Sequence, residues 1–274
     1  YISSRSKGGA VGALLRDHPD LFEGLRMEGC SVALDPKGEH EERRGKAADH
    51  VYDDTLLKSK FSTLYSRMVA KALLEENVAQ PVPLAEALKV RVITKGPALI
   101  QTSLKPLQKY LWKELARHPT MRLIERPVNQ RIIFDALGPL KTGQVFGSGD
   151  YSGATDNLCS WVSDRIVSAI SARIGLSTEE AKLFRLNLTQ NILEHKDQRR
   201  TQQRGQLMGS VTSFPVLCIA NYVVCKLALE FGAGSRLNST KMPLLLNGDD
   251  CAFRTNAFGK EMWAKISAFC GLSP

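Results

Sequence analysis

The order of apolar and polar positions along the chain predicts a series of helices joined by short strands. Over residues 55–76 the apolar side chains recur at helical spacing, which indicates a helix with one buried face. Pro81 and Pro83 follow this segment and are expected to end the helix. Residues 213–231 are apolar nearly all round, as in a helix buried in a core. The other predicted helices cover residues 100–117, 156–174, 178–193 and 258–269.

Shorter runs between these helices predict strands. Residues 89–94 alternate basic and β-branched side chains, which is the pattern of a strand with one charged face. Residues 144–149 form a second strand candidate. Apolar runs lie on both sides of Asn247 and Gly248, and because Asn-Gly favours a tight turn, they predict a β-hairpin. The first strand is basic, and the tip of the hairpin is acidic.

Charge is distributed unevenly along the chain. The 274 residues carry a formal net charge of +9, with a pI near 9.3, which favours a polyanionic partner and nucleic acid ahead of membrane. Residues 81–145 hold 11 Lys or Arg against four Asp or Glu, a net of +7. Lys105, Lys109 and Lys113 fall on one predicted helix face, where a phosphate backbone would relieve their mutual repulsion.

Composition and cysteine spacing narrow the class of protein. The hydrophobic share of 43% and the charged share of 24% are typical of a soluble globular protein. The six cysteines form no CxxC pair, which favours free thiols in a reducing compartment. The longest apolar stretch, residues 214–225, is too short for a membrane span, so neither a secretion signal nor a transmembrane segment is expected. Because the chain starts at Tyr1 rather than Met and stops at Pro274, it is interpreted as a fragment.

The sharpest chemical feature is the pair Asp249-Asp250 at the tip of the predicted hairpin. Two adjacent carboxylates repel each other, and a divalent cation would neutralise them. Magnesium prefers oxygen ligands and usually takes one or two carboxylates together with water and substrate phosphates. The alternative is an ordinary solvated acidic turn.

A second acidic site favours the metal interpretation. Asp150 ends a predicted strand, and Asp156 follows six residues later at a predicted helix start. Two-metal phosphoryl transfer needs carboxylates that clamp both ions, here from separate elements. We therefore expect Asp150 and Asp249 to bridge the ions from adjacent strands. Asp156 is assigned to the sugar, with a helix N-cap as the alternative.

Two further segments could bind a nucleotide. Residues 205–213 form a glycine-containing loop that runs into the apolar helix, where small hydroxyl residues and Asn221 could bind a ribose and a template base. On the basic strand, Lys89 and Arg91 could meet a triphosphate, because such cations stabilise charge in phosphoryl transfer. The alternative for this strand is a solvated charged face.

These features occur in an order that resembles motifs F, A, B and C of viral RNA-dependent RNA polymerases. The residues that carry the resemblance are ITKGPALIQTSLKPLQKYL, SGDYSGATDNL, RGQLMGSVTSFPVLCIAN and LLLNGDD. They look like the polymerases of ourmia-like viruses (botourmiaviruses) of fungi and plants, and more distantly like narnavirus and levivirus replicases. The resemblance runs over residues 89–253.

The resemblance implies an α+β fold, the right-hand polymerase fold, with fingers and an antiparallel palm sheet covered by helices. Residues 1–142 are assigned to the fingers, including the basic strand at 89–95. Residues 143–274 are assigned to the palm, with a fingers insertion at about 175–204. The thumb and the motif D lysine are expected beyond Pro274, so the fragment alone is expected to lack full activity.

The resemblance also implies the site. Asp150, Asp249 and Asp250 are the expected catalytic residues and ligands of two Mg²⁺ ions, with Mn²⁺ as an alternative. The residues expected to bind the nucleoside triphosphate and its ribose are Lys89, Arg91, Asp156, Gly209, Ser213 and Asn221. Thr212 is the alternative to Ser213 for the hydroxyl contact.

The expected activity is templated RNA synthesis for viral RNA replication in the host cytoplasm. Its partners are the RNA template and product and nucleoside triphosphates. One alternative is a reverse transcriptase, against which the Asn-Gly before the paired aspartates and the carboxylate of Asp156 argue. The other is an RNA-binding protein or a decayed polymerase copy, which would not need two separate acidic sites.

Overall fold

The computed structural model describes residues 14, 17–25, 54–124 and 126–273. They belong to two compact units that divide between Glu75 and Glu76. This division follows compactness and lies elsewhere than the functional boundary predicted after residue 142, which stays a prediction.

In the first unit, helix α2 (Asp54–Ala72) holds the short 3-10 helix η1 (Pro19–Phe22). The guanidinium of Arg67 donates hydrogen bonds to the carbonyls of Leu21 and Glu23 at 3.3 and 2.6 Å. The first predicted helix is thus confirmed, although α2 ends one turn earlier than expected.

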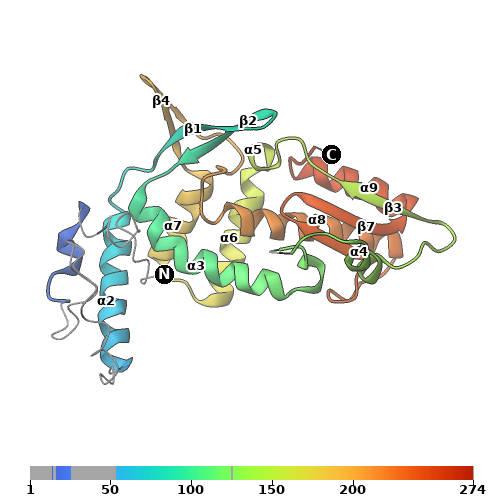
Figure 1. Ribbon diagram of the computed structural model, residues 1–274, viewed down its shortest axis with the longest axis horizontal. Coiled ribbons are helices and arrows are strands. Elements are labelled where there is room, and N and C mark those ends of the chain that lie inside the picture. Colours follow the sequence, from blue (N-terminus) through green and yellow to red (C-terminus); the bar gives the residue numbers. More distant parts are fainter. Residues whose placement is uncertain (1–13, 15–16, 26–53, 125, 274) are drawn as a thin grey trace. The chain divides into compact units, whose positions relative to one another are not determined.

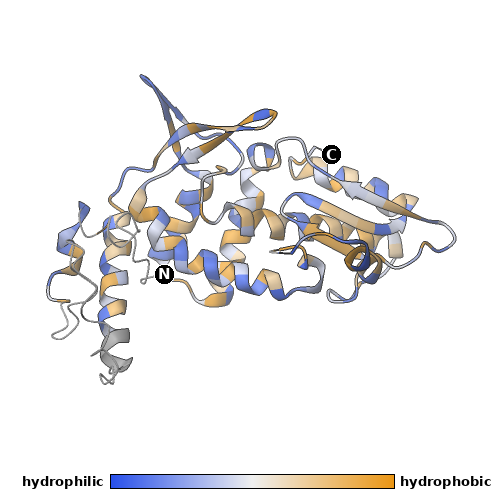
Figure 2. Cartoon of the chain, in the orientation of Figure 1, coloured by the Kyte–Doolittle hydropathy of each residue, from blue (hydrophilic) through white to orange (hydrophobic). Residues whose placement is uncertain are grey.

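The second unit contains a four-stranded sheet in the order β2-β1-β4-β5. Its strands are β1 (Val78–Glu86), β2 (Lys89–Lys95), β4 (Ile192–His195) and β5 (Gln198–Thr201). β1 and β2 form an antiparallel hairpin, and β4 runs parallel to β1 over only two residue pairs. β2 confirms the basic strand predicted from the sequence, whereas β4 and β5 were not predicted as strands. Figure 2 shows the β4–β5 hairpin as largely hydrophilic.

Pro81 and Pro83 lie inside β1 rather than in a break after a helix, so that interpretation was wrong. Proline is tolerated in a strand where its missing N–H faces an unpaired edge. Among the described strands, β4 pairs with β1 only at Val78 and Ala79, which leaves the rest of that edge without a sheet partner. The two prolines can therefore pair with β2 on one side without interrupting a ladder on the other.

The second sheet is antiparallel and has the order β3-β7-β6. Its strands are β3 (Gln144–Gly149), β6 (Leu244–Asn247) and β7 (Asp250–Asn256). One face is covered by helices α8 (Ser213–Ala233) and α9 (Ala257–Phe269), which also pack on each other (Figure 1). The predicted hairpin and the strand at residues 144–149 are both confirmed.

Two glycines on β3 allow aromatic side chains to lie directly on this sheet. A Cβ atom at Gly147 would overlap the ring of Phe253, and one at Gly149 would overlap the ring of Trp263. Phe253 is fully buried and Trp263 nearly so. The sheet and α9 are therefore closely packed beneath the end of β3.

The remaining helices of the second unit are α3 (Ala98–Arg117), η3 (Pro119–Met121), α4 (Gln130–Leu137), α5 (Ala154–Asn157), α6 (Ser160–Ile174) and α7 (Thr178–Thr189). The single helix predicted over residues 156–174 is in fact two, α5 and α6. The chain is extended at Leu158 and Cys159, and the N–H of Cys159 donates to the carbonyl of Cys270 at 2.9 Å. This contact with the end of α9 interrupts the helix, so a tertiary hydrogen bond outweighs local helical preference.

Helix α7 also ends earlier than the predicted residue 193. The side-chain amide of Asn77 donates to the carbonyls of Leu186 and Gln190, both at 2.7 Å, and so satisfies the last turn. The N–H of Ile192 then donates to the carbonyl of Asn77 at 2.9 Å, and the chain continues as β4. The segment predicted as a helical end is therefore the start of a strand.

Helix α8 is long and apolar enough to cross a membrane by length and composition alone. This exceeds the shorter apolar stretch noted in the sequence. In the fold, about half of its most apolar window is buried, and it packs against α9, β6 and β7. Its apolar character is accounted for by this position in the core.

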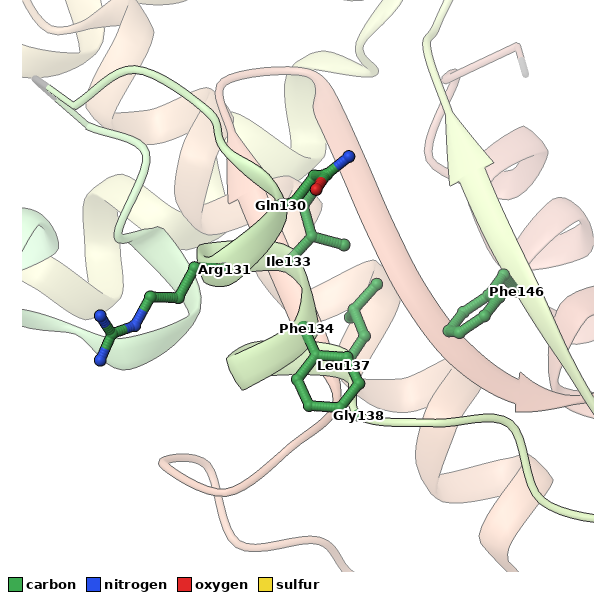
Figure 3. Close-up of a pocket in the computed structure, with 7 residues that line it drawn as sticks. All are labelled: Gln130, Arg131, Ile133, Phe134, Leu137, Gly138 and Phe146. Carbon is green, nitrogen blue, oxygen red and sulfur yellow. The ribbon is translucent and has the colours of Figure 1, made fainter.

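The face of the antiparallel sheet opposite α8 carries an open cavity of about 500 Å³ between α4 and β3 (Figure 3). It is lined by Gln130, Arg131, Ile133, Phe134, Leu137, Gly138 and Phe146. None of the predicted site residues lines this cavity.

Candidate catalytic site

The antiparallel sheet brings three aspartates to the same end of its strands, which we call the acidic edge. The pairing of β3 with β7 ends at Gly149 and Cys251, so the next residues on the two strands are Asp150 and Asp250. Asp249 lies in the two-residue turn that connects β6 to β7. The structure thus brings together the three carboxylates that the sequence suggested as metal ligands, although Asp150 is about 100 residues before the other two along the chain.

The electrostatics of this edge favour a bound cation. The pKa of Asp250 is raised above its ordinary value, first by partial burial and then by the negative charges of Asp249 and Asp150. A divalent cation would remove this repulsion, and oxygen-only donors suit Mg²⁺ or Mn²⁺. Within the described residues, no three acidic, histidine or cysteine side chains converge closely enough to hold an ion by themselves.

The acidic turn is held from below by α8. Gly248 has a φ of +69°, which a glycine adopts without strain, and it is buried against the ring of Phe214. The side-chain amide of Asn221 donates to the carbonyls of Gly248, Asp249 and Asp250 at 3.1, 2.9 and 3.4 Å. Asn221 is 0% exposed, so the structure places this predicted ribose contact inside the protein, on the backbone of the turn.

Tyr151, directly after Asp150, forms a buried polar layer together with Asn221 behind the acidic turn. Its hydroxyl donates to Oδ1 of Asn221 at 3.0 Å and accepts a hydrogen bond from the indole N–H of Trp263 at 2.9 Å. Burial raises the pKa of Tyr151, which stays a neutral phenol. Sequence reasoning missed this residue. Its position next to an expected ligand was the available signal.

Cysteines border the same layer. Cys225 lies 3.4 Å from Oδ1 of Asn221, and burial raises the pKa of its thiol. Cys251 interacts with Cys225 and has a lowered pKa, chiefly because of that contact. The cysteines within the described residues are free, as predicted, and Cys30 lies outside those residues.

The hydroxyls expected to contact ribose point into the protein. Ser213, 3% exposed, donates to the side chain of Gln206 at 3.0 Å, and Thr212, 0% exposed, donates to that of Asn187 at 2.9 Å. In this arrangement both hydroxyls hold the glycine loop, residues 205–213, to its surroundings. Their role toward ribose stays a prediction.

The glycine loop is packed closely at two points. A Cβ atom at Gly209 would overlap the carbonyl of Thr94 near the end of β2, and the N–H of Gly209 donates to the Thr94 hydroxyl at 3.2 Å. A Cβ at Gly205 would overlap the carbonyl of Asp156 on α5. The loop therefore connects the basic strand to the short helix that carries Asp156.

Asp156 lies in the first turn of α5 and is exposed. The N-cap of this helix is Gly153, with no side-chain capping bond, so the N-cap alternative for Asp156 was wrong. Its carboxylate is open to solvent, next to the glycine loop.

Lys89 and Arg91 are exposed on β2, close to the tip of its hairpin with β1. Arg91 pairs with Glu86 at 3.1 Å, and Lys89 lies 3.9 Å from the same carboxylate. Exposed ion pairs of this kind contribute about 0–1 kcal/mol. A more highly charged phosphate could therefore replace Glu86 as the partner of Lys89 and Arg91. Glu86 was not considered in the sequence analysis.

Comparisons with known proteins agree with this arrangement. A family model described as mitovirus RNA-dependent RNA polymerase matches residues 83–265. The RNA-dependent RNA polymerase of Ourmia melon virus (isolate Melon/Iran/VE9) is 34% identical over 212 residues. That alignment covers 70% of this chain and 24% of the relative, so the chain spans about a quarter of the relative's length.

Solved polymerase structures share the fold. The crystal structure of the RNA-dependent RNA polymerase of a human picobirnavirus superposes with a TM-score of 0.59 at 13% identity, over 72% of this chain and 39% of that one. Its insertion-loop deletion mutant gives a TM-score of 0.56 at 13% identity, over 72% and 40%. The mixed helix-and-strand fold and the resemblance to ourmia-like polymerases are thereby confirmed. The chain belongs to the viral RNA-dependent RNA polymerases of the family that the mitovirus model describes.

Proposed function

We propose that this chain forms the fingers and palm of a polymerase that copies viral RNA by transferring nucleotides from nucleoside triphosphates to an RNA 3′-hydroxyl. The observation that carries the proposal is the meeting of Asp150, Asp249 and Asp250 at one edge of an antiparallel sheet. The three carboxylates repel one another. Bound cations together with a polyanionic substrate would account for such a group in a basic protein.

The proposed domains follow the strand pairing. The segment from β4 to β5 lies within the palm half of the sequence, yet it pairs with β1. This supports residues 175–204 as a fingers insertion into a palm of residues 143–274, with residues 1–142 as fingers. The greater length of the ourmiavirus relative leaves room for a thumb elsewhere in the parent polymerase.

In the proposed mechanism, Asp150, Asp249 and Asp250 hold two Mg²⁺ ions, with Mn²⁺ as an alternative. When bound, the ions supply activation of the attacking 3′-hydroxyl and neutralisation of the triphosphate and the leaving pyrophosphate. Lys89 and Arg91 exchange Glu86 for the β- and γ-phosphates. The preorganised acidic edge and the side chains of Lys89 and Arg91 together stabilise the charge that develops at the α-phosphate.

Sugar recognition is assigned to the exposed carboxylate of Asp156, which can accept a hydrogen bond from a 2′-hydroxyl, the group that distinguishes RNA from DNA. Gly209 and Ser213 of the glycine loop complete the proposed ribose site. The proposed polymerase acts on an RNA template and product, and the proposed location is the host cytoplasm.

The test is primer extension on a poly-U template with ATP and Mg²⁺, using the full-length polymerase that contains this sequence. Asp249→Ala should abolish extension. Asp197→Ala, which removes an exposed carboxylate from the β4–β5 turn, should leave it unchanged. Tight RNA binding without extension by the parent would instead favour an RNA-binding protein or an inactive copy.

A further inference from the structure

The backbone of the acidic turn needs support that its own hairpin does not give. Gly248 and Asp249 form a two-residue turn, so their carbonyls lie outside the ladder that joins β6 to β7. Gly248 is buried. A buried carbonyl without a partner costs about 1–3 kcal/mol, so such groups are nearly always hydrogen-bonded.

Asn221 supplies this support from the middle of α8. Its amide donates to the carbonyls of both turn residues, at 3.1 and 2.9 Å, and more weakly to that of Asp250 at 3.4 Å. Only the NH₂ group of an asparagine can donate to a carbonyl, so the contacts fix which way the side chain points. Its oxygen must then face Tyr151.

Tyr151 connects this amide to the other acidic strand. Its hydroxyl accepts from Trp263 at 2.9 Å and, more weakly, from Ser267 at 3.4 Å, which leaves its single proton for Oδ1 of Asn221 at 3.0 Å. Tyr151 is 3% exposed and adjoins Asp150 in the chain. A continuous buried hydrogen-bond path therefore runs from the residue beside Asp150 to the backbone of Asp249.

This hydrogen-bond path holds the turn that contains Asp249, which the pairing of β3 with β7 does not fix. The ladder between β3 and β7 aligns the strands as far as Gly149 and Cys251, but Asp249 lies beyond it. Without the path, the turn could shift relative to Asp150 while the sheet stayed intact. Ligand groups that are held by surrounding hydrogen bonds bind metal more strongly because less must be ordered on binding.

We propose that Asn221 and Tyr151 are positioning residues that set the separation of Asp150 and Asp249 before cations bind. The inference rests on the proposed function of these aspartates. It gives Asn221 a role on the turn in place of the ribose contact expected from the sequence. Neither side chain touches substrate in this role, so both act only through the carboxylates.

The test uses the full-length polymerase with Tyr151→Phe and Asn221→Asp. The first removes one hydroxyl and keeps the ring, and the second keeps the size but replaces the donor amide with an acceptor. Asn77→Asp is the matched control, because Asn77 is also nearly buried and donates to two carbonyls, at the end of α7.

Two readouts separate positioning from general stability. The first is the Mg²⁺ concentration that gives half-maximal extension, which should rise roughly 10-fold in both variants, with kcat lowered and the KM for ATP changed little. The second is the increase in Tm on adding Mg²⁺, which should shrink in both variants and persist in Asn77→Asp. Because both substitutions cut one path, the double variant should be little worse than the poorer single variant.

The outcomes can be told apart. If the parent extends primers and Asp249→Ala does not, the proposed function holds. Parent-like Mg²⁺ dependence in Tyr151→Phe would then overturn the positioning role, even if Asn221→Asp does not fold. If the parent is inactive, the proposed function fails, and the Mg²⁺-induced Tm shift still decides whether the path sets the metal site.

Discussion

The two sheets of the second unit use their polar side chains in opposite ways. On the four-stranded sheet, charged residues are exposed and paired with one another, as Arg199 is with Glu76 and Glu194 at 2.9 and 2.7 Å. Behind the antiparallel sheet, Asn221 and Tyr151 are neutral, buried and hydrogen-bonded to fixed partners. Exposed pairs are weak and exchangeable, whereas buried hydrogen bonds are costly to break. The first arrangement suits contact with a moving nucleic acid, and the second suits a rigid metal site.

The largest effect is expected from Asp250→Asn, which tests whether the acidic edge is a metal site. If Asp250 is a metal ligand as proposed, its removal should lower RNA synthesis by roughly 100-fold or more. Without divalent ions the variant should nevertheless have a higher Tm at neutral pH. The raised pKa of Asp250 means that its ionised form opposes folding.

The pH dependence gives the check for Asp250→Asn. Below the ordinary carboxyl pKa, Asp250 is protonated in both the folded and the unfolded parent, so the Tm gain should disappear there. It should grow as the pH rises through the raised folded-state pKa. Thermal unfolding in EDTA from acid to neutral pH measures this, and a variant less stable than its parent at neutral pH would contradict the repulsion.

Close packing of the three-stranded antiparallel sheet can be tested with Gly149→Ala. The added methyl group must displace the ring of Trp263, which should lower the free energy of unfolding by about 1–3 kcal/mol. Denaturant unfolding measures the loss. In the double variant with Trp263→Phe, the smaller ring leaves room, so its loss should be less than the sum of the two single losses. Strict additivity would show that the two groups do not compete for space.

Asp156→Ala tests the exposed side of the site. Loss of a hydrogen bond to a charged acceptor, about 1.5–3 kcal/mol, should reduce the preference for ATP over dATP roughly 10- to 100-fold. The ratio of kcat/KM for the two nucleotides measures this preference, with Asp197→Ala as the control. An unchanged ratio would remove Asp156 from sugar recognition.

The smallest expected effect concerns the exchangeable pair on β2. Glu86→Gln frees Arg91 for phosphate and should lower the KM for ATP by less than about threefold, because the exposed pair is weak. The change should diminish at high salt. Arg91→Gln should act in the opposite direction. If Glu86→Gln raised the KM, Glu86 would be aiding nucleotide binding rather than competing with it.

Local sequence signals predicted the parts of the fold that local forces determine. The Asn-Gly turn predicted the acidic hairpin, and the alternation in residues 89–94 predicted β2, because both patterns are complete within a few residues. The β4–β5 hairpin was missed because β4 has two adjacent apolar residues, Ile192 and Leu193, followed by polar ones, and β5 is polar throughout, so neither strand shows alternation. Helix ends were misplaced where distant groups, such as Asn77, satisfied the last turn.

The candidate site also had residues that local sequence identified and residues whose role depends on distant contacts. The three aspartates could be found from the sequence because a carboxylate pair in a turn and a second acidic pair at defined spacing are visible there. The role of Asn221 could not, because its partners are backbone carbonyls 27 to 29 residues away. Nothing in a side-chain pattern identifies such a contact.

The pairing of strands has a consequence for the order in which the protein can form during synthesis. β1 must wait for β4, more than 100 residues later, and β3 must wait for β7, again about 100 residues later. Pairings so distant in sequence are slow to form and leave strand edges open in the meantime. Asp150 leaves the ribosome long before Asp250, so the proposed metal site cannot form in the nascent chain until the hairpin of β6 and β7 has been translated. Premature termination anywhere before the hairpin would therefore yield a chain that has the basic strand β2 but lacks Asp249 and Asp250.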